Sequence, residues 1–152
     1  MNKQYFLQNE FISQLKTIHP SMQPLFGKMN VQQMVEHMSY AFQQASGLIP
    51  LPAINDASAT EKMYRIMMSE KPFRDNTPNV YLPDEPTPAI CKTIEESLLA
   101  LQKDIEVFFA VFEKNNDQKI LNPFFGDLNF EEWVHLLHKH ALHHLRQFGI
   151  NL

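Results

Sequence analysis

The stretch NFEEWVHLLHKHALHHLRQFG, residues 129–149, decides the fold of this 152-residue chain. Its apolar side chains recur every three or four residues, which is the spacing of an amphipathic helix. Asn129 supplies an N-cap with Glu132 as its capping-box partner, and Gly149 marks the end of the helix. Five of the seven histidines also lie here: His135, His138, His140, His143 and His144. The segment predicts a helix that carries both core residues and candidate metal ligands.

Three further segments show the helical period, and they are residues 2–17, 30–46 and 93–114. Asn30 and Gln33 form a second capping-box pattern, and Pro20 stops the first segment. From Ile94 to Phe112 the apolar positions alternate steps of four and three, which is typical of a seam inside a helical bundle. Four long helices predict an all-α, four-helix bundle, formed as one domain over residues 1–152.

The middle of the chain is less regular. Residues 60–69 predict a short helix, and residues 71–90 hold five prolines and predict an extended crossover after the second helix. A crossover of this length is either functional or a plain connection between helix ends. Residues 122–128, with Pro123 and Gly126, predict a turn-rich connector without strands.

Composition excludes several classes of function. The net charge is −4, with 13 Lys and Arg against 17 Asp and Glu, and no basic run is present. Binding to nucleic acid or to an anionic membrane surface is therefore not expected. The single Cys91 excludes an internal disulfide and is expected to be a small buried residue. No apolar run suits a signal peptide or a membrane span, so a cytoplasmic protein is expected.

A helical wheel of about 100° per residue separates the five histidines of the last helix. With His140 at zero, His144 falls near +40° on the apolar stripe, and His143 falls near −60° at its border beside Gln147. His135 and His138 point to the opposite side and are predicted to be solvated.

Burying His140 and His144 side by side is unfavourable unless each imidazole finds a partner. A shared metal ion is one solution, and a hydrogen-bond network or a buried carboxylate is another. The remaining histidines are His19, which precedes Pro20 and is predicted at a helix end or the surface, and His37, at the border of the second helix. His37 would complete a set of three imidazoles that leaves a coordination position open, as catalytic metal sites do.

These residues carry a resemblance to a known family. Gly27-Lys28-Met29-Asn30, followed seven residues later by His37, resembles the DinB-like (YfiT-like) superfamily, as does Trp133 leading into the run from His140 to Gly149. The similarity is greatest to a branch of unknown function whose last helix carries the same His-His-Leu-Arg-Gln-Phe-Gly run. The resemblance implies a four-helix bundle with a long crossover after the second helix, often found as a homodimer.

The resemblance also implies a divalent ion, nickel, zinc or iron, held by His37, His140 and His144. It places Gln147 beside the last ligand in a supporting role, whereas His143 stands where other residues are common. The activities it implies are thiol S-transfer with low-molecular-weight thiols and related thiol-dependent isomerisation.

Several functional hypotheses follow from this site. A three-histidine ion would lower the pKa of a bound thiol or water, which favours a metal-dependent thiol transferase or hydrolase acting on a small molecule. His143 or Glu36 would be its general base. The alternatives are a non-catalytic metal- or ligand-binding stress-response module, and a bundle whose histidines satisfy one another without metal.

Overall fold

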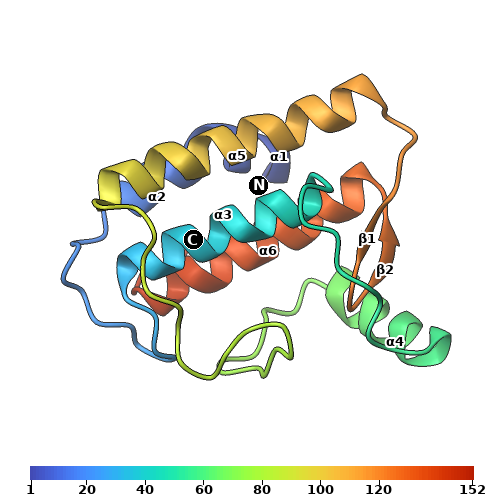
Figure 1. Ribbon diagram of the computed structural model, residues 1–152, viewed down its shortest axis with the longest axis horizontal. Helices are drawn as coiled ribbons and strands as arrows, with labels where there is room; N and C mark the ends of the chain where they lie inside the picture. The colour runs from blue at the N-terminus through green and yellow to red at the C-terminus, as the bar shows by residue number, and fades with distance from the viewer.

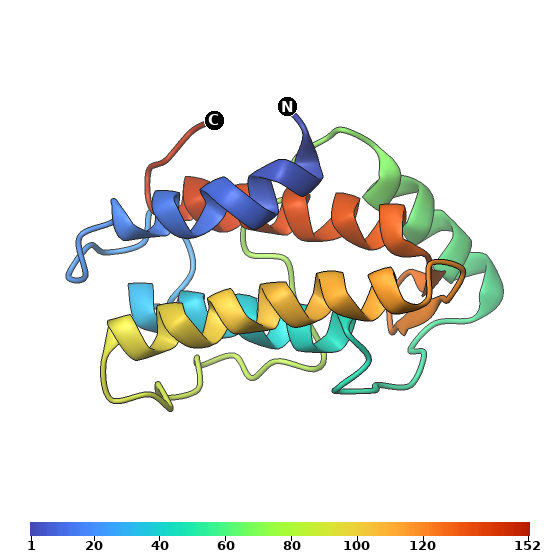
Figure 2. The ribbon, with the colours of Figure 1, turned by 90° about the horizontal axis from the view of Figure 1, so that it is seen from above.

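The computed structural model describes residues 1–152, and its four long helical segments run along one axis in two layers (Figures 1 and 2). The elements are α1 (Lys3–Tyr5), η1 (Phe6–Glu10), α2 (Phe11–Lys16), α3 (Val31–Ala45), α4 (Ala57–Met68), α5 (Ile94–Lys114), β1 (Ile120–Asn122), β2 (Gly126–Leu128) and α6 (Phe130–Gln147). The continuous segment α1–η1–α2 lies beside α6, and α3 lies beside α5 (Figure 2). The predicted all-α bundle is confirmed.

The helix boundaries follow the predicted caps closely. Asn30 and Asn129 each accept from the backbone N–H three residues on and complete the capping boxes with Gln33 and Glu132. Helix α4 begins three residues earlier than expected, because Asp56 caps it. The first segment contains a π-helical turn, η1, which the sequence did not predict.

The crossover after α3 is confirmed, and it carries α4 at one end of the bundle (Figure 1). The expectation of a strand-free connector at residues 122–128 is wrong, because β1 and β2 form an antiparallel hairpin with Ile120 opposite Leu128. Three-residue strands are too short for an alternating pattern to be recognised. The hairpin also holds the start of α6, since the indole Nε1–H of Trp133 donates to the Ile120 carbonyl at 3.0 Å.

One core of 26 buried apolar residues lies between the two layers. Its largest fully buried side chains include Trp133, Phe6, Phe42 and Phe108. Cys91, predicted to be buried, is partly exposed. No helix has the length and apolar character needed to cross a membrane.

The prediction that His135 and His138 are solvated is wrong, since their exposed fractions are only 7% and 6%. The wheel could not show that α4 and the N-terminal segment cover this face of α6. His135 Nδ1 lies 2.7 Å from the Lys3 ammonium and its Nε2 lies 3.0 Å from the Met67 carbonyl. The His138 ring packs edge-on against Phe6 at 5.2 Å between centroids.

Glu36 on α3 holds the end of the crossover in place. Its carboxylate accepts from the backbone N–H groups of Ile90 (2.8 Å) and Cys91 (3.0 Å) and from the hydroxyl of Ser97 (2.9 Å). Partial burial alone would raise the pKa of the Glu36 carboxyl, but these donors outweigh burial and lower it.

Replacing Glu36 by Ala leaves three donors without their acceptor, so we expect the free energy of unfolding to fall by about 1–2 kcal/mol. The amides of Ile90 and Cys91 should lose protection from hydrogen exchange. The matched control is Glu61→Ala, which removes an exposed ion pair with Arg65 one turn away and should cost about 0.5 kcal/mol or less. Equal effects of the two substitutions in urea unfolding would contradict this role of Glu36.

Candidate metal centre

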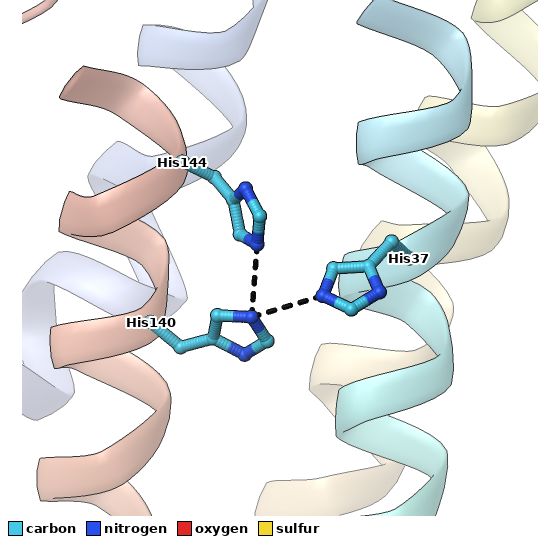
Figure 3. A group of neighbouring side chains, drawn as sticks. All are labelled: His37, His140 and His144. Atoms are coloured by element: carbon cyan, nitrogen blue, oxygen red, sulfur yellow. Dashed lines mark hydrogen bonds between the residues drawn. The ribbon is translucent and has the colours of Figure 1, made fainter. Parts of the chain in front are cut away.

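Three imidazoles from two helices converge on one point (Figure 3). His37 comes from α3, and His140 and His144 come from adjacent turns of α6. The Nε2 of His140 lies 3.0 Å from the Nε2 of His37 and 2.9 Å from the Nε2 of His144. All three donor atoms lie within 4.8 Å of one another. A tetrahedral ion with metal–nitrogen bonds of about 2.0–2.1 Å separates its ligand atoms by about 3.3 Å, so the spacing fits one ion.

Local structure explains why these side chains meet. Residues 140 and 144 are one helical turn apart, so they share a face of α6. On α3, the capping box at Asn30 sets the helix start, and Met34 and Met38 are buried on either side of His37 in the sequence. Because α3 packs against α6, the border position of His37 faces the two imidazoles.

Burial keeps the three imidazoles neutral. It lowers the pKa of His37 to about 4, with a further contribution from the nearby His143. Burial also lowers the pKa values of His140 and His144 well below the usual 6.5, and the histidines of the cluster reinforce this by mutual repulsion of their charged forms. Neutral imidazole is the form that binds metal.

Gln147 determines which nitrogen of His144 faces the centre. His144 Nδ1 lies 2.9 Å from the Gln147 Oε1, and both residues are buried. An amide oxygen only accepts, so Nδ1 carries the proton and Nε2 presents a lone pair. A hydrogen-bonded second nitrogen of this kind is usual for histidines that bind metal.

Hydrogen bonds alone do not satisfy the three Nε2 atoms. With the His144 Nε2 unprotonated, a proton on the His140 Nε2 can be directed to only one of its two neighbours. A proton on the His37 Nε2 instead leaves the two α6 nitrogens facing each other without a hydrogen. No carboxylate belongs to the cluster. A cation at the centre interacts favourably with all three lone pairs, and so the donor set fits a divalent ion.

The crossover also contributes to the site. The Phe73 ring lies 6.5 Å from the His140 ring and 6.2 Å from the His143 ring, between centroids. Arg146 holds this segment in place by donating to the Phe73 carbonyl at 3.0 Å and to the Asp75 carboxylate at 2.5 Å. The crossover was expected either to be functional or to be a plain connection between helix ends, and these contacts favour a functional role. The sequence pattern of prolines did not single out Phe73.

The other candidate residues lie outside the trio. His19 is exposed and its Nδ1 bonds Ser21, as expected for a residue at a helix end. His143 packs against the His144 ring at 5.1 Å, and its Nδ1 is buried without a hydrogen-bond partner. Both carboxylate oxygens of Glu36, the alternative general base, accept hydrogen bonds from the end of the crossover, and Glu36 is not part of the trio.

Comparison with known families agrees with this geometry. A family model described as the DinB superfamily matches residues 12–148. The chain belongs to the DinB superfamily, which is a superfamily of metal-binding proteins. No curated protein and no solved structure matched the chain significantly. Membership of the particular branch with the His-His-Leu-Arg-Gln-Phe-Gly run stays a prediction.

We expect protein purified without a nickel column to contain about one divalent ion per chain, and His37→Ala, His140→Ala and His144→Ala each to lose it, because two imidazoles hold an ion much more weakly than three. The control is His19→Ala, which removes a surface imidazole and should retain the ion. Elemental analysis alongside circular dichroism measures both metal content and folding. Ion-free wild-type protein that also fails to take up added zinc, nickel or iron would contradict the site.

The metal-free protein should become less stable as the pH falls. The His37 pKa is about 4 in the folded state and near 6.5 when unfolded, so the unfolded chain binds the proton first. The stabilisation is complete above about pH 6.5 and is lost progressively as the pH falls through about 4, on the order of 3 kcal/mol in total for this residue and about 2 kcal/mol of it between pH 7 and pH 5. Urea unfolding at pH 7 and pH 5 measures the change. His37→Gln should make the profile less steep, with the remaining slope due to His140, His144 and His138, whose pKa values are also lowered, whereas His19→Gln should leave it as it is.

Proposed function

We propose that this protein is a metal-dependent enzyme that activates a thiol or a water molecule for attack on a small-molecule substrate. The activity is thiol S-transferase-like or hydrolase-like, with a low-molecular-weight thiol as the co-substrate in the first case. The observation that carries the proposal is the convergence of three neutral Nε2 atoms, from His37, His140 and His144, on one point.

A divalent ion held by three imidazoles would lower the pKa of a thiol or water in its open position, so that the nucleophile is present at neutral pH. Imidazole ligands suit nickel, zinc and iron alike. His144 is buried, whereas His37 and His140 are partly exposed. A substrate would therefore approach the site from the side of these two residues.

His143 is our candidate for the general base. Burial and the neighbouring Arg146 lower the pKa of its imidazole, so the ring is neutral and able to accept a proton at pH 7. Its Nδ1 is enclosed, which leaves Nε2 as the nitrogen that exchanges a proton. The His143 ring packs edge-on against the His144 ring at 5.1 Å between centroids, so the candidate base lies beside one of the proposed ligands. We further propose a cytoplasmic homodimer, on the strength of the family resemblance.

A direct test offers the metal-loaded protein a low-molecular-weight thiol, glutathione or bacillithiol, with an aryl halide electrophile, and in parallel an activated ester for hydrolysis. His144→Ala should abolish turnover together with metal binding. His143→Gln should retain the ion and lower kcat by about 10²–10⁴-fold, which is the usual contribution of a general base.

The control for the thiol assay is Cys91→Ser, because Cys91 is the only thiol of the chain and is outside the trio. It should leave turnover unchanged. A protein that holds the ion but is inactive in both assays would favour the non-catalytic binding module instead.

A further inference from the structure

We propose that the loop between α2 and α3, residues 17–30, is a positioning element of the metal centre, and that Gly27 is the residue that allows it to act. The inference rests on the proposed metal centre, but it concerns a property of the metal-free protein and is tested there. Gly27 acts through Gln147 on His144, at the far side of the imidazole from the ion.

The loop is attached to the last turn of α6 at two successive residues. The backbone N–H of Leu25 donates to the Gln147 carbonyl at 2.8 Å, and the Gln147 side-chain Nε2 donates to the Phe26 carbonyl at 2.8 Å. The Phe26 ring also packs against the His143 ring at 5.1 Å and lies 5.6 Å from the Arg146 guanidinium carbon. Loop and helix end therefore form one packed unit.

The Phe26 carbonyl determines the orientation of the Gln147 amide. A carbonyl oxygen only accepts, so the amide must turn its NH₂ toward Phe26 and its oxygen toward His144. That oxygen in turn requires a proton on His144 Nδ1, 2.9 Å away. The Nε2 lone pair of His144 is thus oriented toward the centre by a carbonyl on a separate loop.

Gly27 makes this approach sterically possible. A Cβ at this position would lie 2.7 Å from the Gln147 Nε2, which is closer than real Cβ atoms come. Gly27 also has φ +73°, in the left-handed region that glycine adopts without strain. A methyl group here must displace the amide, and without the amide His144 is free to carry its proton on Nε2, where it blocks the ion.

Gly47 provides a matched control. Its φ is +75°, so Gly47→Ala carries the same backbone strain as Gly27→Ala. A Cβ at Gly47 meets only the Ile120 side chain, at 3.8 Å, which is an ordinary van der Waals distance. The difference between the two variants therefore isolates the contact with Gln147.

The decisive measurement is the tautomer of His144 in metal-free protein, read from long-range ¹H–¹⁵N NMR spectra of its ring. Wild type and Gly47→Ala should show the Nδ1–H form, and Gly27→Ala should show a mixture or the Nε2–H form. Zinc affinity, measured by competition with a chelator, should fall about 10–100-fold in Gly27→Ala relative to Gly47→Ala.

A double-mutant cycle with Gln147→Ala tests the same contact independently, even if Gly27→Ala folds poorly. Truncating Gln147 removes the group that the methyl would strike, so Gly27→Ala should cost little further affinity in that background. Additive losses, or an unchanged His144 tautomer in Gly27→Ala, would overturn the proposal. If wild type binds no ion, the metal centre fails while the tautomer comparison still decides the role of Gly27.

Discussion

The burial of neutral imidazoles between α3 and α6 is the constraint on which the rest of this structure depends. A histidine removed from water is tolerated only if it stays uncharged and its polar nitrogens find partners. Three Nε2 atoms converge where the two helices meet, and no proton arrangement satisfies all of them. Burying the three imidazoles together is consequently unfavourable without an ion, and a cation bound between them makes it favourable.

Helix α6 is covered on nearly every side, although its composition is polar. The N-terminal segment and the end of α4 supply partners on the face away from the trio, where Lys139 donates to the carbonyls of Ile66, Met67 and Ser69 at 2.8–3.2 Å. These contacts place a lysine at the C-terminal end of α4, where a positive charge is favourable. The polar residues of α6 therefore hold the surrounding segments against the helix and also form the candidate metal centre.

Segments far from the trio in the sequence complete the site. The crossover brings Phe73 against His140 and His143, and its last residues are held by Glu36. The loop before α3 brings the Phe26 carbonyl to Gln147, which contacts His144. Each of these contacts joins a loop to one of the two helices that carry the trio. The positions of the three imidazoles are therefore set by α3 and α6, and the loops adjust their orientation.

Much of the fold was predictable because its signals are local. The helices, with their caps at Asn30 and Asn129, follow from periodicity and from side chains that bond backbone groups three residues away. The hairpin was not predicted, because three-residue strands show no recognisable pattern. The burial of His135 and His138 was not predicted, because a helical wheel does not show what packs against a polar face. Among the site residues, the i, i+4 spacing selected His140 and His144, and the family resemblance agreed on His37.

The amino-acid sequence by itself determined the helices and the side of α6 that carries His140 and His144, since both depend on interactions between residues only a few positions apart. Only the tertiary structure decided that His37 reaches the same point, that the Phe26 carbonyl orients Gln147, and that Gly27 must lack a side chain. Those facts depend on the separation of atoms more than 100 residues apart in the chain. That separation is set by how α3, α6 and the loop before α3 pack together.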